Sequence, residues 1–214
     1  MIAQRIEAGA ARMGIELPEN AAEKMGIYWE RVLAANQTMN LTRIVDEKEA
    51  CNLHYLDSLA PLQYGFDMIG EGASVLDVGT GAGFPGVPIA MARPDLSMTL
   101  IDARRKRIDF ILKALSDIAP AVKALHCRAE DMKATYDVVM ARAVAPGAAL
   151  AKLLLPLVRP GGLVLLWKGP GVFEELKQID HESSRFKGCL LEPIFYEIPE
   201  QDAEHCLIPI EKMR

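Results

Sequence analysis

The chain has 214 residues, of which 50% are hydrophobic and 25% are charged. These proportions are those of a globular protein with a sizeable core, so they exclude a disordered or low-complexity chain. The length favours one domain, alone or with an appendage, over two full catalytic domains.

A net charge of −5 would argue against a nucleic-acid partner if the excess acidic residues were spread over the whole chain, but they are not. Residues 174–214 hold ten acidic and five basic residues, which accounts for the whole excess. Residues 1–173 are balanced, and their densest basic run is Arg104-Arg105-Lys106-Arg107. A local basic surface is therefore compatible with the composition.

Signals for export, membrane insertion and metal binding are weak. The first fifteen residues carry Arg5, Glu7 and Arg12 and lack the apolar core of a signal peptide. The longest uncharged run, Val78–Ala92, is interrupted by four glycines and two prolines. The four cysteines form no C-x-x-C pair and lie far from the histidines, so neither a disulfide framework nor a zinc site is predicted. We expect a cytoplasmic protein with no metal and no membrane segment.

Residues 1–65 read as helical and show no strand pattern. Apolar residues recur there every three to four positions, for example Ile2, Ile6, Ala10 and Met13. We expect this region to pack as a helical unit on a second domain that spans residues 66–214.

From Ser74 onward, short apolar runs alternate with helical stretches. The expected strands are Ser74–Val78, Ser97–Ile101, Val122–Cys127, Tyr136–Met140, Leu163–Trp167, Leu190–Ile198 and Cys206–Ile210. The expected helices are Val87–Arg93, Arg104–Ile118 and Ala148–Leu157. This alternation predicts an α/β fold with a seven-stranded, mostly parallel sheet, to which the last two strands add an antiparallel edge.

The most informative stretch is the loop Gly79-Thr80-Gly81-Ala82-Gly83-Phe84-Pro85-Gly86, which joins the first strand to a helix. Glycine tolerates positive φ and lets a ligand lie against bare backbone. In open α/β sheets, ligands bind beyond the carboxyl ends of the strands, and the first strand–helix turn is the usual place. The loop therefore predicts a cofactor site.

Two cofactors compete for this loop. Gly81-x-Gly83-x-x-Gly86, followed by Asp102, formally satisfies the dinucleotide fingerprint of an NAD(P)-dependent oxidoreductase. Asp77, however, already lies at the end of the strand, where its carboxylate can hold an aminoacyl ammonium. That arrangement suits S-adenosylmethionine, which is cationic and has no pyrophosphate. With either cofactor, Asp102 is placed to accept hydrogen bonds from ribose hydroxyls.

The sequence resembles the glucose-inhibited division protein B family, the bacterial 16S ribosomal RNA (guanine-N7) methyltransferases. The resemblance covers nearly the whole chain. It rests on Asn40-Leu41-Thr42, His54-x-x-Asp57-Ser58, the glycine loop with its Pro85-Gly86 ending, Lys106-Arg107, Ala141-Arg142-Ala143 and Lys168-Gly169.

The resemblance implies a Rossmann-like S-adenosylmethionine-dependent methyltransferase that acts on 16S rRNA or the small ribosomal particle. It implies that Gly79 and Phe84 contact the cofactor, that Asp102 holds its ribose and that Ala129 and Glu130 border its adenine. It also places Arg142 in the site. Ala141 stands where many relatives have serine, which puts a hydroxyl role at that position in doubt. A catalytically silent RNA-binding relative remains an alternative.

Guanine N7 carries a lone pair and no proton, so its methylation requires no general base. Arg142, just after an expected strand, is our candidate catalytic residue, with an ion pair to an acid such as Asp77 as the structural alternative. Arg105, Lys106 and Lys168 are candidate contacts to RNA phosphates. For the His54–Asp57 pair we favour a structural hydrogen bond over a substrate contact.

Overall fold

The computed structural model describes residues 1–63, 69–142, 145–169 and 171–214. Its centre is an eight-stranded sheet with the order β3-β2-β1-β4-β5-β8-β6, in which β7 also pairs with β8. The strands are β1 (Ser74–Val78), β2 (Ser97–Asp102), β3 (Lys123–His126), β4 (Tyr136–Arg142), β5 (Val158–Lys168), β6 (Gly188–Leu190), β7 (Ile194–Tyr196) and β8 (His205–Lys212). The strands β1 to β5 run parallel, and β8 is antiparallel to β5, β6 and β7. The predicted mostly parallel sheet with an antiparallel edge is confirmed.

The predicted number of seven strands is wrong by one, because the expected strand Leu190–Ile198 divides into β6 and β7. Between them lies Pro193, which has no N–H to donate to the ladder. The pairing with β8 also shifts by one residue between Leu190↔Ile210 and Ile194↔Leu207. The two short strands therefore share one edge of β8.

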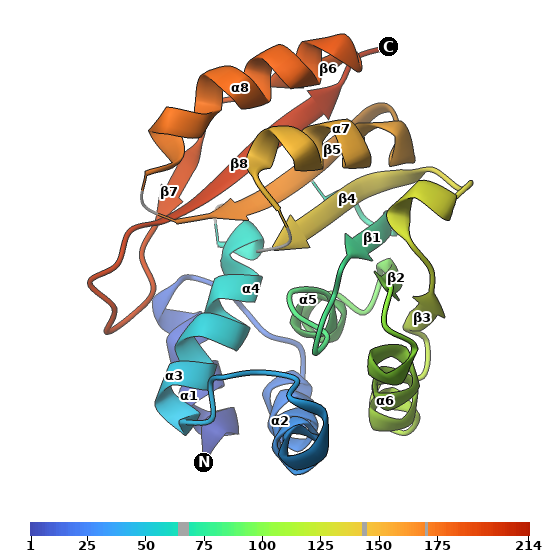
Figure 1. Ribbon diagram of the computed structural model, residues 1–214. Helices are drawn as coiled ribbons and strands as arrows, with labels where there is room; N and C mark the ends of the chain where they lie inside the picture. The colour runs from blue at the N-terminus through green and yellow to red at the C-terminus, as the bar shows by residue number, and fades with distance from the viewer. Residues whose placement is uncertain (64–68, 143–144, 170) are drawn as a thin grey trace.

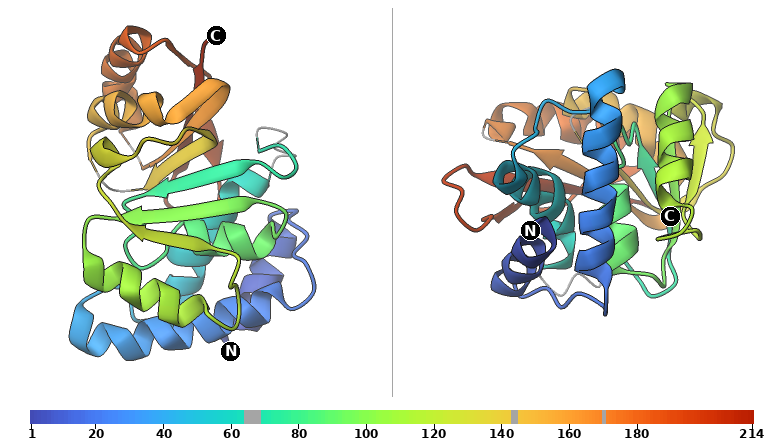
Figure 2. Two further views of the ribbon diagram at one scale, coloured as in Figure 1. Left: turned by 90° about the vertical axis from the view of Figure 1, so that its right-hand side faces the viewer. Right: turned by 90° about the horizontal axis from the view of Figure 1, so that it is seen from below.

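Helices cover both faces of the sheet (Figures 1 and 2). One face carries the N-terminal elements α1 (Ile2–Arg12), α2 (Ala21–Met39) and η1 (Cys51–Leu56, a π-helix), together with α5 (Gly86–Ala92) and α6 (Arg105–Leu115). The short elements α3 (Glu47–Ala50), α4 (Asp57–Leu59) and η2 (Ala60–Leu62) connect this region. The other face carries α7 (Gly147–Leu154), η4 (Leu155–Leu157) and α8 (Val172–Arg185).

Alternate residues of each strand feed the two cores, as the pleat requires. In β1, Val75 belongs to the core beneath the N-terminal helices, and Leu76 belongs to the core beneath α7 and α8. The N-terminal helices share a continuous core with the sheet. The domain boundary expected between residues 65 and 66 lies outside the described residues.

Two elements differ from the sequence analysis. It assigned no helix to residues 172–185, where the structure has α8 with Val172, Ile179 and Ser183 buried. The strand expected at Leu163–Trp167 begins earlier, at Val158, so that the turn-like residues Arg159-Pro160-Gly161-Gly162 belong to β5. Gly161 has φ +83° there, and the pairing with β4 is irregular between Tyr136 and Val138. An extended but irregular strand start reads locally like a turn.

Candidate active site

The glycine loop leaves β1 at the carboxyl edge of the sheet and is held to β2. The backbone N–H groups of Gly79 and Thr80 both donate to the Ile101 carbonyl, at 2.9 and 3.0 Å. Gly79, Gly81 and Gly83 all have positive φ, which only glycine adopts readily. A Cβ at Gly81 would meet open space, with only the Gly79 carbonyl oxygen nearby at 3.9 Å. At Gly83 a Cβ would overlap the Tyr28 hydroxyl and Val87, so packing requires that glycine.

Asp77 is fully buried beneath this loop. Its Oδ2 accepts hydrogen bonds from Thr80 Oγ1 at 2.6 Å and from the Gly86 N–H, the first of α5, at 2.9 Å. Its Oδ1 is buried and has no hydrogen-bond partner among the described residues. Burial raises the pKa of Asp77 to about 6. The structure therefore presents a carboxylate oxygen that a cationic ligand group can satisfy.

Asp102 ends β2 and joins the loop from the neighbouring strand. It is only 4% exposed. Oδ1 accepts from the Arg104 N–H at 2.8 Å, and Oδ2 accepts from the Gly81 N–H at 3.1 Å and from Arg107 Nη1 at 3.0 Å. A carboxylate has about four acceptor sites, so room remains for a ribose hydroxyl, and more if the Arg107 side chain moves away.

Ala129 and Glu130 lie in η3 (Ala129–Asp131), a short turn after β3. The Cys127 N–H, just before this turn, donates to the Asp102 carbonyl at 3.3 Å. Ala129 is buried, whereas Glu130 is exposed. The structure thus brings this turn close to Asp102, on the side of the sheet edge away from Arg142.

Arg142 is the last residue of β4, and its partner is Asp57 rather than Asp77. Its Nη1 donates to Asp57 Oδ2 at 2.7 Å and to the Leu53 carbonyl at 2.8 Å. Both side chains are largely buried, with 15% and 12% exposed. The ion pair fastens the N-terminal region to the sheet edge.

Asp57 also bonds to three other strands. Its Oδ1 accepts from the Tyr196 hydroxyl at 2.5 Å and lies 3.3 Å from His205 Nδ1. Its carbonyl accepts from Trp167 Nε1 at 2.8 Å. Burial favours the protonated acid, but hydrogen bonds from His205, Tyr196 and Arg142 together with the charge of Arg142 lower the pKa of Asp57 below its usual value. The sequence analysis missed Tyr196 and His205, because nothing local to either residue points to Asp57.

His54 contacts the glycine loop and not Asp57, while Asp57 makes the structural hydrogen bonds from the helical start to the sheet that were expected of this pair. The Nε2 atom of His54 lies 2.9 Å from Thr42 Oγ1. Its ring stacks on Phe84 with centroids 4.4 Å apart and an interplanar angle of 8°. Burial and the charge of Arg142 lower the pKa of His54 to about 4, so it is neutral at physiological pH.

The Phe84 ring is buried and offers no exposed surface on which a base could stack. Its side chain is 6% exposed, and Tyr28, His54 and Tyr55 pack around it. The Arg142 guanidinium lies 5.9 Å from the ring centroid. Phe84 instead joins the glycine loop to the residues around Arg142.

A pocket of about 510 Å³ opens beside Arg142, at the carboxyl ends of β4 and β5. We call it the Arg142 pocket. Its lining comes from η1, α4 and the ends of β4, β5 and β8, and it includes Ile44, Leu53, His54, Asp57, Arg142, Ala145, Trp167, Lys168, Gly169 and His205. The glycine loop and this pocket share a wall, formed where Phe84 meets His54 and Arg142.

The basic candidates are separated. Lys168 lines the Arg142 pocket, but its Nζ is paired with Glu175 Oε2 at 2.8 Å. Arg105 and Lys106 lie exposed on the first turn of α6, near Asp102, and Arg105 pairs with Asp109 at 2.9 Å. The structure therefore places these three residues on two parts of the sheet edge.

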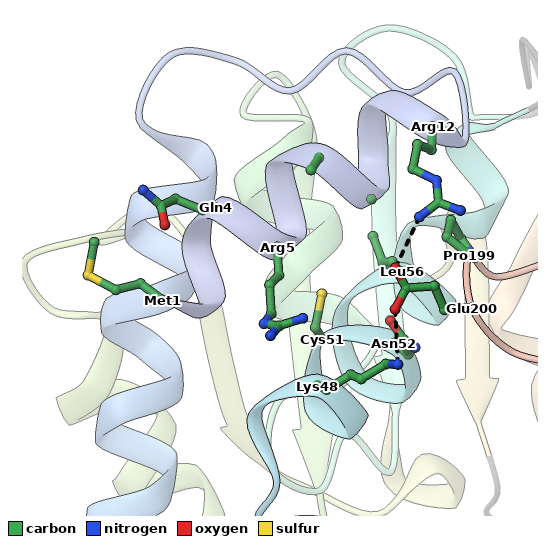
Figure 3. A pocket seen from close by; sticks show the side chains of 12 residues that line it. Met1, Gln4, Arg5, Arg12, Lys48, Cys51, Asn52, Leu56, Pro199 and Glu200 are labelled. Carbon is green, nitrogen blue, oxygen red and sulfur yellow. Dashed lines mark hydrogen bonds and ion pairs between the residues drawn. The ribbon is translucent and has the colours of Figure 1, made fainter.

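A second pocket, of about 370 Å³, lies on the opposite side of η1 (Figure 3). Glu200 reaches into it and bridges Arg12 at 3.3 Å and Lys48 at 3.0 Å. All three side chains are about half exposed. This pocket is a solvated ion-pair cluster away from the strand ends, so the Arg142 pocket is the better candidate for substrate.

The described residues contain neither a membrane-spanning helix nor a metal-binding cluster. No helix in that part of the chain is long and apolar enough to cross a bilayer. No group of three or more His, Cys, Asp or Glu side chains there is arranged to hold a metal ion.

Comparison with known proteins places the chain in a family. A model of the family described as rRNA small subunit methyltransferase G matches residues 21–193. A protein of that name from Lachnoclostridium phytofermentans is 36% identical over 96% of this chain and 87% of its own length. Another from Alkaliphilus oremlandii is 35% identical over 98% and 90%.

Solved structures share the fold at low sequence identity. A putative RNA methyltransferase from Pyrococcus horikoshii has a TM-score of 0.57 and 11% identity, over 87% of this chain and 98% of its own. M. jannaschii TYW2, solved with AdoMet, has a TM-score of 0.54 and 12% identity, over 67% and 70%. These likenesses confirm the predicted Rossmann-like methyltransferase fold. By its match over most of its length, the chain belongs to the rRNA small subunit methyltransferase G family.

Proposed function

We propose that this methyltransferase uses S-adenosylmethionine to methylate N7 of a guanine in 16S rRNA of the small ribosomal subunit. The observation that carries the proposal is the wall shared by the glycine loop and the Arg142 pocket, where Phe84 packs on His54 and lies beneath Arg142. A cofactor on the loop and a base in the pocket would then be neighbours. A ribosomal substrate implies the cytoplasm as the compartment.

The residues of the loop fit S-adenosylmethionine. Asp77 Oδ1 is a buried acceptor with no partner among the described residues, as the aminoacyl ammonium requires. Asp102 is placed for the ribose hydroxyls, and the open space beside Gly81 leaves backbone accessible. In this proposal Gly79 and the Phe84 backbone also border the cofactor, and Ala129 and Glu130 border its adenine.

When bound, the cofactor supplies an electrophilic methyl group on a sulfonium. The N7 lone pair forms the new N–C bond, the C–S bond breaks with its electrons left on sulfur, and the positive charge passes to the purine. No proton has to move, so the protein contributes orientation and electrostatics, of which orientation alone provides up to about 7–11 kcal/mol. Arg142 acts here as a fixed donor and charge beside the base.

N7 faces the deep groove of an RNA helix, which side chains do not enter. The target guanine must therefore lie in a loop or be turned out of its stack. In this proposal Lys168, Arg105 and Lys106 contact the neighbouring phosphates, and Lys168 exchanges its ion pair with Glu175 for a phosphate.

The oxidoreductase alternative is disfavoured by Asp77. A dinucleotide pyrophosphate binds at the N-terminus of the helix after the glycine loop. Here the first N–H of α5, that of Gly86, is already bound by Asp77, and a carboxylate repels a pyrophosphate. A silent RNA-binding relative would retain the basic residues without binding a cofactor.

Two measurements test the proposal. Calorimetric titration should show binding of S-adenosylhomocysteine and none of NADH. Mass mapping of 16S rRNA from cells with and without the gene should show one 7-methylguanosine that depends on this protein. Binding of NADH alone would support the oxidoreductase, binding of neither ligand would support the silent relative, and an unchanged methylation pattern would defeat the rRNA assignment.

A further inference from the structure

The His205 imidazole has one satisfied and one unsatisfied nitrogen. His205 begins β8, and its side chain is 13% exposed. Nδ1 lies 3.3 Å from Asp57 Oδ1. Nε2 is buried, has no hydrogen-bond partner among the described residues, and belongs to a side chain that lines the Arg142 pocket. A buried polar atom without a partner is uncommon, and one in a pocket beside reactive groups indicates a place for a ligand atom.

The surroundings of His205 determine what kind of ligand atom it accepts. Asp57 can only accept a hydrogen bond, so in the neutral imidazole the proton resides on Nδ1 and Nε2 keeps its lone pair. Asp57 is itself held by the Tyr196 hydroxyl and by Arg142 Nη1. These contacts therefore fix the orientation of the imidazole and leave Nε2 as an acceptor without a donor.

The target guanine offers such a donor on the edge opposite to its reaction centre. N7 and O6 are acceptors, and N7 must stay bare to receive the methyl group. The other edge carries the N1–H and the exocyclic amine, both of which are donors. Adenine has no proton at N1, so an acceptor aimed there distinguishes guanine from adenine.

We propose that Nε2 of His205, with the ring oriented by Asp57, accepts a hydrogen bond from N1–H of the target guanine. This inference rests on the proposed function and names how its substrate is selected. As the methyl group reaches N7, the purine gains positive charge and its N1–H becomes more acidic. The hydrogen bond strengthens in the transition state, so it contributes to kcat and not only to binding.

The test is a cycle that changes the enzyme and the base together. Small-subunit particles are reconstituted with guanine, or with 2-aminopurine, at the methylated position. 2-Aminopurine keeps N7 and the amine but lacks N1–H. We expect the guanine-to-2-aminopurine ratio of kcat to be about tenfold smaller for His205→Ala than for the wild type, the scale of one lost donor–acceptor pair. His205→Gln, which offers a carbonyl oxygen as acceptor, should recover part of the ratio.

Controls separate this inference from folding and from the proposed function. His181→Ala, at an exposed histidine on α8, should behave as the wild type. Melting temperature and S-adenosylhomocysteine affinity should be unchanged in His205→Gln. If the wild type methylates guanine but His205→Ala leaves the guanine-to-2-aminopurine ratio as it was, the inference is overturned and the proposed function stands. If the wild type methylates no guanine in the particle, the proposed function itself fails.

Discussion

Asp77 is a carboxyl group whose ionisation is opposed by folding and favoured by a cationic ligand. Its pKa rises from an ordinary 3.8 to about 6 because it is buried. In the folded, ligand-free protein Asp77 therefore holds its proton more tightly than in the unfolded chain. The stability gained from this difference is present below pH 3.8 and is lost as the pH rises to about 6. An ammonium group beside Oδ1 reverses the preference, since it stabilises the charged form.

We accordingly predict that S-adenosylhomocysteine affinity rises with pH up to about pH 6 and then levels off, because binding below that pH must first remove the proton from Asp77. Calorimetric titration across this range measures the effect. Asp77→Asn should bind more weakly and show a flatter profile. A wild-type affinity independent of pH over this interval would remove Asp77 from the ammonium site.

Arg142 has a structural role as well as the proposed catalytic one. Arg142→Ala leaves the Asp57 carboxylate buried without its cation, which typically costs about 3–5 kcal/mol. We therefore expect Arg142→Ala to lower the melting temperature, whether or not the arginine is catalytic. Arg142→Lys keeps the charge, should melt closer to the wild type, and isolates the planar guanidinium fork.

The decisive measurement for Arg142 is kcat on the particle, corrected for folded fraction. We expect a loss of about 10²-fold in Arg142→Ala, the scale of one oriented charged contact. The kcat of Arg142→Lys should lie between those of the wild type and Arg142→Ala if the positive charge dominates. Near-native kcat in the folded fraction of Arg142→Ala would leave the arginine with only its ion pair to Asp57.

Sequence reasoning at this scale succeeded for residues that one motif brings together. Gly81 and Asp102 are 21 positions apart, yet the strand–turn–strand pattern predicts their proximity, and they share a hydrogen bond. It failed for Tyr196 and His205, whose connection to Asp57 spans more than 130 residues and depends on how the antiparallel edge folds back. Nor could the burial of Phe84 be predicted from its position in a loop, because exposure is decided by tertiary packing.

In the glycine loop, Gly81 and Gly83 look equivalent in the sequence but are required for different reasons. Gly81 has open space where a side chain would stand, whereas Gly83 is packed against α2 through Tyr28, whose hydroxyl donates to the Ala82 carbonyl at 2.9 Å. One glycine leaves room for a ligand, and the other leaves room for a helix.

Two substitutions should separate these requirements. Gly83→Ala has to displace Tyr28 and Val87 and should cost about 1–3 kcal/mol of stability, as overpacking does. Gly81→Val is strained by the positive φ of +63° but displaces no packed side chain, and it should abolish S-adenosylhomocysteine binding by filling the open space. Thermal denaturation and calorimetry of both variants give the comparison. Equal losses of stability with retained binding in Gly81→Val would place the cofactor elsewhere.

Among the elements, the parallel strands of the sheet could be predicted from short apolar runs that alternate with helices. Strands buried on both faces have such nearly continuous apolar sequences. The helix α8 could not, since its acidic and polar composition hid the three buried residues on its inner face. The split of β6 from β7 depends on a single proline within an otherwise extended segment.

In the molecule as a whole, the N-terminal region packs directly against the glycine loop and is not a separate appendage. Tyr28, His54 and Tyr55 pack on Phe84. We predict that a chain of residues 66–214 alone is poorly folded and does not bind S-adenosylhomocysteine, because this aromatic cluster and the Asp57 network are removed. Circular dichroism and titration of that fragment measure both. Tight binding by the fragment would show that the two regions are independent.

The position of Asp57 has a consequence for when the enzyme becomes competent during synthesis. Its partners Tyr196 and His205 lie within the last 19 residues of the chain, and β8, which carries His205, sits inside the sheet between β5 and the short strands. A nascent or carboxyl-terminally clipped chain holds the whole glycine loop but lacks the strand that closes the Arg142 pocket. The Arg142 pocket is therefore completed only when the strands β7 and β8 are in place, although the glycine loop lies wholly before them in the sequence.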